Sequence, residues 1–408
     1  MDERKILTDL FKAYYAARIH KRGTRSAMAF EMNYEKKLLQ LGHELAAGTY
    51  TIGRSMCFIC FKPLQREIFA ADFRDRIIHH LIYNYINPLF ERSFLNDSYS
   101  CRTGKGTSYG IKRLNHFIRS CSRNYAQDCY ILKLDIKGYF MSIDKNILYK
   151  KIEEKINDLK EPRGFDPVWL LALIHQVVFH DPTKDCIMKG KKEDWRGLPS
   201  SKSLFGAKPD VGLPIGNLTS QLFGNVYLNE FDHFVKYELG CAYYGRYVDD
   251  IVIVHPDKEY LKSIIPIIRR YLYEKLSIEL HPKKIYLQNF RNGVPFLGVI
   301  VKPYRMYVRN RIKDNFYRNI QQWNRLLAEN ESGFLEEHQG KFVASINSYL
   351  GMLGHCDTYN LRRKMLTERL SPDFKKFVRN EDNYHKIISN NPAIIRDNAA
   401  VKIRDDFL

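Results

Sequence analysis

The stretch that decides the fold of this chain is YYGRYVDDIVIV, residues 243–254. Two apolar runs flank a short polar tip, which is the pattern of a β-hairpin. Asp249 and Asp250 lie at that tip. Carboxylates beside buried strands are unfavourable unless a cation or hydrogen-bond donors compensate them, but Asp is also a common turn residue. The hairpin alone therefore leaves two interpretations open, an ordinary polar turn or a metal site.

A third carboxylate has the same setting far upstream. Residues 130–135, YILKLD, form a buried-strand pattern that ends in Asp135. Transfer of a nucleotide to a 3′ hydroxyl group builds up negative charge, and two divalent ions about 3.5–4 Å apart stabilise the attacking and leaving oxygens. Mg²⁺ prefers oxygen ligands held by rigid elements. The three acids together therefore predict a two-metal site for nucleotidyl transfer.

The charge balance indicates a polyanionic partner. The 65 Lys and Arg residues outnumber the 46 Asp and Glu residues, which gives a formal net charge of +19. A basic surface concentrates polyanions and gains from counterion release on binding. We therefore expect nucleic acid as the partner, ahead of an acidic membrane surface or a merely solvated basic surface.

Targeting and redox features are weak. The charged N-terminus lacks the apolar core of a signal peptide, and no stretch reaches the roughly 18 apolar residues that span a bilayer. The eight cysteines are scattered, and Cys57 and Cys60 lie in an apolar strand-like run with no second pair nearby. We expect a cytoplasmic protein with no membrane partner, reduced thiols and no zinc site.

Apolar periodicity predicts a mixed α+β chain. Residues 5–48 and 72–90 have helical patterns, whereas residues 50–61 and 67–71 have strand patterns. Residues 181–212 are rich in Lys, Gly, Pro and Ser and lack periodicity. A loop of that length inside a compact protein is usually functional or mobile.

Several segments, in order and in spacing, resemble reverse transcriptases over about residues 50–360. LDIKGYF, residues 134–140, is similar to the first catalytic strand of that family. YVDD, residues 247–250, is similar to its Tyr-x-Asp-Asp hairpin, and PFLG, residues 295–298, resembles the turn that grips the primer. The resemblance implies an RNA-directed DNA polymerase that copies a template RNA with dNTPs and holds an RNA/DNA hybrid.

The fold that the resemblance implies is a right-hand polymerase, an α+β architecture whose palm contains a small antiparallel sheet. The implied division is an N-terminal helical extension (residues 1–48), fingers (49–129), a palm (130–300) with an insertion near the template (181–212), a helical thumb (301–370) and a tail (371–408) whose role the sequence does not indicate.

The resemblance also assigns site residues. The positions at the two Mg²⁺ ions, for which Mn²⁺ is a substitute, are Asp135, Ile136, Asp249 and Asp250. Phe140, five residues after Asp135, falls where the family places an aromatic side chain beneath the sugar, and such a ring excludes a 2′ hydroxyl by contact. The other positions at the nucleotide are Lys62, Arg66, Ile215, Gly216, Gln221 and Lys284, with Arg74 and Arg76 as further candidates. Lys284 matches a family lysine near the pyrophosphate leaving group.

Nucleic-acid contacts are expected along a groove. The primer grip implied by the resemblance consists of Phe296, Leu297 and Gly298, and the template-strand contacts are Arg102 and Lys105. The first of two predicted amphipathic C-terminal helices carries the basic residues Arg309, Arg311, Lys313, Arg318 and Arg325. Such contacts position the duplex without reading its sequence, and for each residue plain solvation is the competing interpretation.

The segment GLPIGNLTSQ, residues 212–221, narrows the family. Most reverse transcriptases have Gln-Gly where this chain has Ile215-Gly216, and Ser-Pro where it has Ser220-Gln221. The departure resembles the enzymes of diversity-generating retroelements. Ile cannot form the hydrogen bond that Gln forms near the sugar, and a lost polar contact costs about 1–3 kcal/mol. The alternative is that Ile215 merely packs.

The narrower resemblance implies an error-prone polymerase that miscopies template adenines in mutagenic retrohoming. It also implies a partner, a small basic oligomeric accessory protein encoded nearby. Two alternatives stay open: a defence-associated or group II intron-like bacterial reverse transcriptase, and a non-catalytic RNA-binding scaffold. The presence of all three acids argues against the scaffold.

Overall fold

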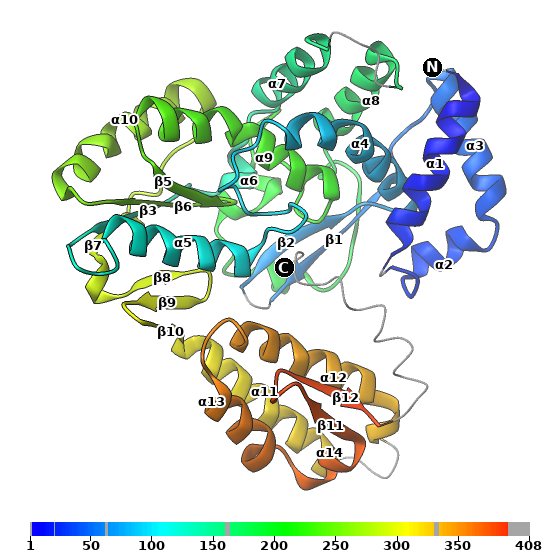
Figure 1. The fold of residues 1–408 in the computed structure, drawn as a ribbon. Coiled ribbons are helices and arrows are strands. Elements are labelled where there is room, and N and C mark those ends of the chain that lie inside the picture. The colour runs from blue at the N-terminus through cyan, green and yellow to red at the C-terminus, as the bar shows by residue number, and fades with distance from the viewer. Residues whose placement is uncertain (1, 20, 62–63, 160–163, 330–333, 391–408) are drawn as a thin grey trace. The chain divides into compact units, whose positions relative to one another are not determined.

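The computed structural model describes residues 2–19, 21–61, 64–159, 164–329 and 334–390 of the chain (Figure 1). The chain divides into two compact units. The first comprises Met1–Cys101, Lys133–Ile251 and Lys262–Ile285, and the second comprises Arg102–Leu132, Val252–Leu261 and Tyr286–Leu408. Each unit is described below by itself.

The first unit begins with three helices, α1 (Glu3–Arg18), α2 (Arg25–Glu31) and α3 (Tyr34–Ala47), and α1 packs against α4 (Phe73–Glu91). Helix α1 is amphipathic: its buried apolar residues recur at helical spacing and include Ile6, Leu10 and Tyr14. The Tyr14 ring stacks on Tyr34 of α3, with 5.0 Å between ring centroids. The helical pattern predicted for residues 5–48 is confirmed.

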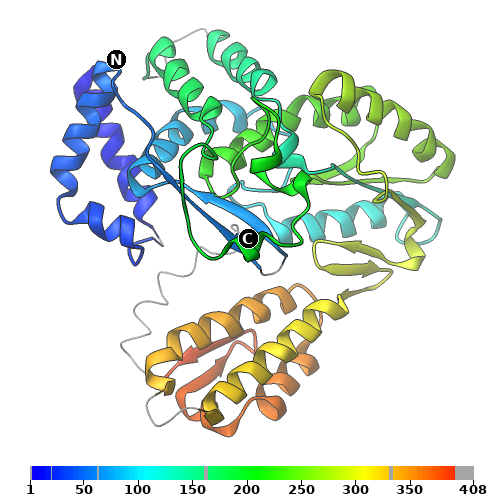
Figure 2. The same ribbon diagram turned by 180° about the vertical axis from the view of Figure 1, so that it is seen from behind.

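A three-stranded sheet follows, formed by β1 (Ser55–Cys60), β2 (Arg66–Ala70) and β4 (Cys186–Met188) in the order β2-β1-β4. Strands β1 and β2 are antiparallel, and β4 pairs parallel to β1. Figure 2 shows the segment that contains β4 beside this hairpin. Residues 181–212, predicted as a loop without regular structure, therefore contain a strand, and three short 3₁₀ turns follow it.

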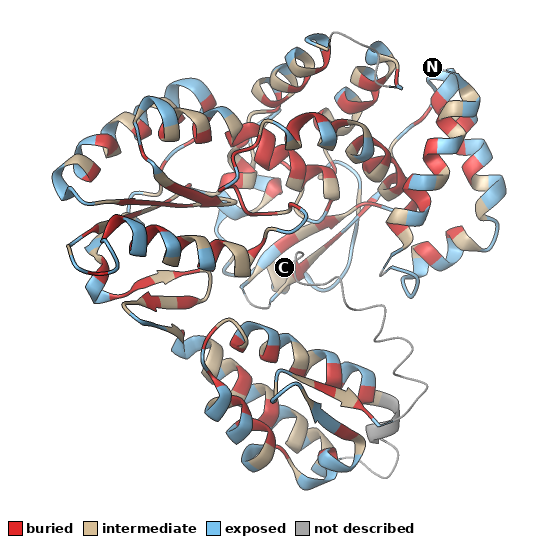
Figure 3. Cartoon of the chain, in the orientation of Figure 1, coloured by how far each residue is buried: buried red, intermediate tan, exposed pale blue. Residues whose placement is uncertain are grey.

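The central elements are β3 (Tyr130–Asp135), α6 (Tyr139–Ser142), α7 (Lys145–Asn157), α8 (Pro167–Phe179), α9 (Leu218–His233), β5 (Tyr243–Tyr247), β6 (Asp250–His255) and α10 (Lys258–Leu276). With β7 (Tyr286–Asn289), the strands form a sheet in the order β5-β6-β3-β7, and β3 and β6 each run from one unit into the other. Figure 3 shows that α9 and β6 are largely buried, which agrees with four consecutive buried residues in β6.

Helix α9 is the centre of the first unit. It packs against α4 and α7, and its buried face includes Phe223, Val226, Tyr227 and Phe231. A π-helical turn over Phe234–Glu238 continues it. Because α9 is enclosed by other elements, polar side chains on it need partners within the protein.

The second unit contains α5 (Thr107–Cys121) and a sheet of β8 (Val294–Phe296), β9 (Val299–Lys302) and β10 (Arg305–Val308), in the order β10-β9-β8. Helices α11 (Asn310–Glu329) and α12 (Phe334–Leu353) pack together, and the Phe316 and Tyr349 rings stack at 5.1 Å. The two predicted amphipathic C-terminal helices are thus present.

The C-terminal region continues this helical pair as far as it is described. After α13 (Tyr359–Lys364) come α14 (Pro372–Phe377) and a hairpin of β11 (Val378–Glu381) and β12 (Lys386–Ser389). The Asn347 side chain of α12 donates to the Ile387 carbonyl and accepts from its N–H, both at 2.8 Å. Residues 371–390, for which the sequence indicated no role, therefore pack on α12.

The predicted α+β class is confirmed, with three small mixed or antiparallel sheets and a two-stranded hairpin among the described residues. Within those same ranges, no helix combines the length and apolar character needed to span a membrane.

Candidate active site

The turn between β5 and β6 carries the predicted Tyr-x-Asp-Asp tip. Val248 and Asp249 connect the two strands. Val248 has a backbone φ of 55°, a left-handed conformation that is rare for a β-branched residue. Its N–H donates to Ser100 Oγ at 3.2 Å, and its carbonyl accepts from Arg246 Nη1 at 3.0 Å. Both backbone polar groups of this unfavourable residue are therefore held by side chains.

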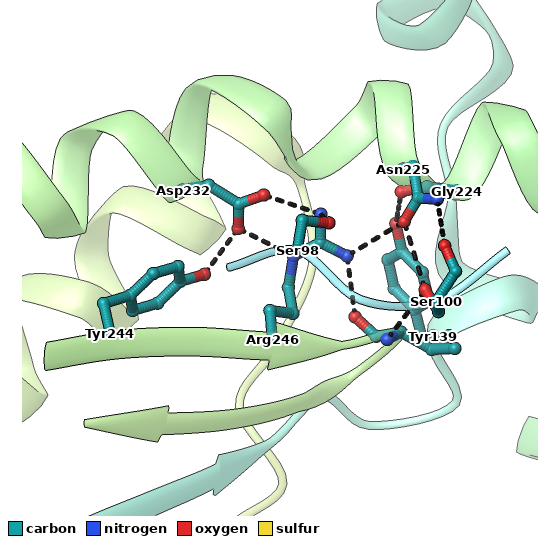
Figure 4. Close-up of polar contacts among 9 residues, drawn as sticks. Ser98, Ser100, Tyr139, Gly224, Asn225, Asp232, Tyr244 and Arg246 are labelled. Atoms are coloured by element: carbon teal, nitrogen blue, oxygen red, sulfur yellow. Dashed lines mark hydrogen bonds and ion pairs between the residues drawn. The ribbon is translucent and has the colours of Figure 1, made fainter. Parts of the chain in front are cut away.

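Arg246 is buried to 0% exposure although it lies on β5. Its Nε and Nη2 donate to the two carboxylate oxygens of Asp232 on α9, each at 2.7 Å (Figure 4). Tyr244 donates its hydroxyl to the same carboxylate, and Nη2 also donates to Ser98 Oγ at 3.2 Å. Burial of an ion pair is tolerated when both charges are fully bonded, and this geometry provides the bonds.

A second contact ties the turn to the same helix. Ser100, which accepts from Val248, donates its hydroxyl to Asn225 Oδ1 at 3.2 Å, and Asn225 Nδ2 donates to the Ser100 carbonyl at 2.8 Å. Figure 4 shows Asp232 and Asn225 reaching from α9 toward the hairpin. Helix α9 therefore fixes the β5–β6 turn through two side chains, Asp232 and Asn225.

The three predicted metal ligands share one electrostatic environment. Asp135 ends β3, Asp249 lies in the turn and Asp250 begins β6, the strand next to β3 in the sheet. Burial, together with the negative charges of Asp135 and Asp250, raises the pKa of Asp249 to about 6, whereas the positive charge of Lys284 acts in the opposite direction. The fold thus concentrates negative charge at Asp249. Ile136 follows Asp135, is buried and forms a bridge with Leu280.

Two lysines partly neutralise these acids. Lys284 Nζ donates to both oxygens of Asp135, at 3.0 and 2.9 Å. Lys133 Nζ lies 3.5 Å from Asp250 Oδ1. Within the described ranges, no group of three or more His, Cys, Asp or Glu side chains is arranged to hold a metal ion. An ammonium group within about 4–6 Å of a carboxylate favours its charged form. Three carboxylates with this excess of negative charge fit the oxygen ligands that Mg²⁺ requires.

Phe140 lies on α6 and is half-buried. Its carbonyl accepts from the N–H of Leu213 at 2.8 Å. On the side of α9, a Cβ atom on Gly224 would lie 3.2 Å from Phe140 Cε1, so glycine permits the ring to approach the helix closely. Helix α9 therefore contacts both the β5–β6 turn and the Phe140 ring, which is predicted to exclude a 2′ hydroxyl and is called the steric gate below.

The segment around Ile215 lies against β2. The N–H of Phe69 donates to the Ile215 carbonyl at 2.8 Å, and Asn217 Oδ1 accepts from the Ala71 N–H at 3.1 Å. Gly216 has a φ of 123°, and a Cβ there would lie 2.9 Å from Ile68 Cγ2. Side chains of Phe140 and Ile215 border one apolar cluster, formed by Cys57, Phe69, Met141 and Leu204. The structure thus brings these predicted nucleotide residues together.

The remaining residues predicted at the nucleotide differ in burial and in their partners. Gln221 lies on α9, and its Oε1 is buried without a hydrogen-bond partner among the described residues. Arg66 is the exposed first residue of β2, and Lys62 lies outside the described residues. Arg74 forms an ion pair with Glu44 and lies 4.9 Å from the Tyr50 ring centroid. That pairing gives Arg74 a structural partner.

The predicted nucleic-acid residues lie in the second unit. Leu297 and Gly298 connect β8 to β9 with φ values of 44° and 88°, and positive values at both central residues are typical of a type I′ hairpin turn. Lys105 lies 4.2 Å from the Tyr109 ring centroid, and Arg102 is buried. On or next to α11, the arginines predicted to face phosphate are exposed, namely Arg309, Arg311, Arg318 and Arg325, and Lys313 is half-buried.

Sequence reasoning missed the Arg246–Asp232 pair and the role of Glu67, which is described below. The signal was present: Arg246 and Asp232 are opposite charges within otherwise apolar buried segments. A charge that interrupts a core element needs a partner. Nothing in the sequence names that partner, because the two residues meet only through the packing of α9 on β5.

The chain has relatives among known proteins. Residues 65–301, more than half of the chain, match the family model described as reverse transcriptase (RNA-dependent DNA polymerase). Protein YkfC of Escherichia coli (strain K12) is 22% identical over 260 residues, covering 55% of this chain and 60% of YkfC. The group II intron-encoded protein LtrA of Lactococcus lactis subsp. cremoris is 24% identical over 204 residues, covering 49% of this chain and 28% of LtrA.

A solved structure of telomerase from Candida albicans, in complex with the TWJ fragment of telomeric RNA, is 11% identical with a TM-score of 0.46. The match covers 86% of this chain and 68% of that one. This chain thus spans less than two thirds of the length of the two curated relatives.

Proposed function

This chain belongs to the reverse transcriptase family, and we propose that it is an RNA-directed DNA polymerase that copies a template RNA into cDNA from dNTPs. The observation that carries the proposal is the arrangement of the three acids: burial raises the pKa of Asp249, and the negative charges of Asp135 at the end of β3 and of Asp250 at the start of β6 also raise it. Three acids from β3 and the β5–β6 hairpin are what a two-metal nucleotidyl transfer requires.

Asp135, Asp249, Asp250 and the adjacent Ile136 would hold two Mg²⁺ ions, or Mn²⁺ in their place. Bound there, the ions supply charge stabilisation to the attacking and leaving oxygens. The protein's own residues supply position. The contacts of Val248 with Arg246 and Ser100 fix the turn that carries two of the acids. Lys284 holds a positive charge beside Asp135 and serves the departing pyrophosphate.

Phe140 selects the sugar in this proposal. The ring is held between Gly224 of α9 and the cluster around Leu204. An aromatic ring fixed on both sides cannot move aside for a 2′ hydroxyl. The proposed substrates are therefore 2′-deoxynucleoside triphosphates, and the proposed partner is a template RNA and its hybrid with cDNA, in the cytoplasm. Exposed arginines on α11 would contact the duplex phosphates.

The finer proposal is an error-prone enzyme of a diversity-generating retroelement, working with a small basic accessory protein. The Ile215-Gly216 and Ser220-Gln221 pattern supports it. The Ile215 side chain borders the apolar cluster. Because it is aliphatic, it offers no hydrogen bond to a nucleotide bound there. We expect Ile215→Gln to lower misincorporation opposite template adenines in sequenced cDNA. An unchanged adenine error rate would leave Ile215 with a packing role only.

A second candidate is a group II intron-like reverse transcriptase, which the similarity to LtrA favours. The genomic neighbourhood separates the two. A template repeat paired with a variable repeat, beside a gene for a small basic protein, supports mutagenic retrohoming. A flanking intron RNA supports the second candidate.

Primer extension on an RNA template tests the activity. With Mg²⁺ and four dNTPs, we expect the wild-type protein to extend an annealed DNA primer and Asp249→Ala to give no extension above background. Circular dichroism of both proteins shows whether the variant is folded. A wild-type protein that binds the primer–template but never extends it would instead support the RNA-binding scaffold.

A further inference from the structure

Glu67 is a buried carboxylate outside the proposed metal site. It lies on β2 and is 1% exposed. Its Oε2 accepts from Trp195 Nε1 and from Ser203 Oγ, both at 2.8 Å, and its Oε1 accepts from the N–H of Leu204 at 2.6 Å. All three donors are neutral and belong to one segment, residues 195–213, which we call the bridging segment.

Burying a carboxylate that has no bonded cation costs free energy unless hydrogen-bond donors surround it. Among the described residues, the partners of Glu67 are these three donors. Gln65, two residues away on the chain, adds contacts where the segment begins: its Nε2 donates to the carbonyl of Asp194, just before the segment, at 2.7 Å and to that of Arg196 at 3.3 Å. One end of the bridging segment is thus held firmly to the β2 hairpin.

The other end of the bridging segment is bonded to the residues around Phe140. The N–H of Leu213 donates to the Phe140 carbonyl, and the N–H of Gly212 donates to the Ile143 carbonyl, both at 2.8 Å. In between, the Ser201 carbonyl would lie 2.5 Å from a Cβ on Gly138, in the turn that follows Asp135. The segment therefore runs from the Glu67 carboxylate to the turn that carries Phe140.

Side-chain packing connects the same two places. Leu204, whose N–H bonds to Glu67, is buried in the cluster with Cys57, Phe69 and Met141. Phe140 and Ile215 pack against that cluster, as does Trp195. On the opposite side, α9 approaches the Phe140 ring at Gly224. Leu204 and Phe140 are thus connected through one apolar cluster, so a shift of Leu204 is expected to change the packing around Phe140.

We propose that Glu67 is a positioning residue for nucleotide selection: by holding Trp195, Ser203 and Leu204, it fixes the bridging segment against Phe140 and so sets the discrimination between 2′-deoxyribonucleoside and ribonucleoside triphosphates. The proposal rests on the proposed polymerase function. Glu67 touches no reacting atom in it. Its effect passes through the apolar cluster that contains Leu204 and against which Phe140 packs.

The test measures kcat/KM for addition of one dNTP and of the matching rNTP to a primer on an RNA template. The informative quantity is the kcat/KM for the dNTP divided by the kcat/KM for the rNTP. A loss of folded protein lowers both values alike and leaves this ratio unchanged. Phe140→Ala serves as the reference for a removed gate. Glu193→Gln is the matched control, since Glu193 is an exposed acid in the 3₁₀ turn that precedes the segment.

We expect Glu67→Gln to lower the dNTP-to-rNTP efficiency ratio roughly tenfold. The amide oxygen of Gln still accepts a hydrogen bond, but its NH₂ group is itself a donor and would face a donor of the bridging segment. Trp195→Phe, which removes one N–H and keeps a ring, should lower the ratio by a smaller factor. Phe140→Ala should lower it most, and Glu193→Gln should leave it unchanged.

A folded Glu67→Gln protein with the wild-type ratio overturns the proposal. If Glu67→Gln does not fold, Trp195→Phe decides in the same way. A wild-type ratio in Phe140→Ala also overturns it, because the residue being positioned would then have no selective role. By contrast, a wild-type protein that adds no dNTP at all contradicts the proposed function itself.

Discussion

Two buried carboxylates hold the two halves of the candidate site, and they do so differently. Asp232 is paired with the guanidinium of Arg246 at 2.7 Å, and that guanidinium also bonds the carbonyl of Val248. Glu67 is bonded by an indole, a hydroxyl and a backbone N–H. One anchor is an ion pair that contacts the turn proposed to bind metal, and the other is a set of neutral donors in the segment that reaches the proposed nucleotide site.

The two buried carboxylates differ in the charge of the groups that bond to them. The turn carries Asp249 in a field already made negative by two further acids. The Arg246 guanidinium, paired with Asp232, donates to the Val248 carbonyl and so helps to hold Val248 in its unfavourable left-handed conformation. At the bridging segment, the three groups that donate to the Glu67 carboxylate are neutral. Each of these hydrogen bonds is weaker and individually replaceable.

The largest expected effect comes from breaking the ion pair. Arg246→Met leaves the Asp232 charge buried without its partner, which typically costs about 3–5 kcal/mol of stability. Urea unfolding of the variant checks this value. The exposed Arg22→Met is the control and should change stability by less than about 0.5 kcal/mol.

The double variant Arg246→Met with Asp232→Leu sharpens the comparison. Removing both buried charges should recover most of the lost stability. Nucleotide addition should stay low, however, because the Val248 carbonyl has still lost its donor. Recovery of both stability and activity would show that the pair serves folding alone.

A smaller loss is expected at the neutral anchor. Glu67→Gln should cost about 1–3 kcal/mol, since one or two donors lose their acceptor while no lone charge is left buried. Measured by the same urea unfolding, it should rank below Arg246→Met. The reverse ranking would contradict the account of the two anchors.

A third buried contact, between His79 and Thr219, predicts that the stability of the protein depends on pH. His79 Nδ1 lies 2.7 Å from Thr219 Oγ1, and burial, followed by the charge of Arg76 and the fields of His80 and His180, lowers the pKa of His79 to about 3. The unfolded chain therefore takes up a proton below pH ~6.5 that the folded chain refuses. Stability present above pH ~6.5 is lost as the pH falls toward about 3, by up to about 1.4 kcal/mol per pH unit.

Unfolding free energies at pH 7 and pH 5 measure this loss. His79→Gln should show a shallower fall than the wild type, by about 2 kcal/mol over that interval. His80, whose pKa burial lowers to about 4, keeps part of the slope in the variant. Equal slopes in the two proteins would mean that His79 is protonated in the folded state.

The smallest expected effects compare two helical glycines. In Gly224→Ala the new methyl group would lie 3.2 Å from Phe140 Cε1, so the ring must shift and dNTP addition should fall several-fold. Gly351 on α12 has open space around it, and Gly351→Ala should raise stability by roughly 0.5–1 kcal/mol with unchanged addition. Equal rates of dNTP addition by the two variants would show that the approach of α9 to the Phe140 ring does not matter for activity.

Local patterns were sufficient to predict the β5–β6 hairpin with its two acids, the strand that ends at Asp135, and helices such as α4 and α11. Each carries its own periodicity. Strand β4 escaped prediction because three residues have no measurable alternation, and it exists only through pairing with β1. Glu67 and Asp232 could be placed on their elements, but not with Trp195 or Arg246, because those partners meet only in the folded chain.

Single-nucleotide addition on an RNA template, followed as the Mg²⁺ concentration rises, tests most directly whether three acids act together on divalent ions. We predict saturable addition by the wild-type protein and a loss of roughly a thousandfold or more in both Asp135→Asn and Asp249→Asn. Addition by either variant at the wild-type rate and the wild-type Mg²⁺ dependence would contradict the account.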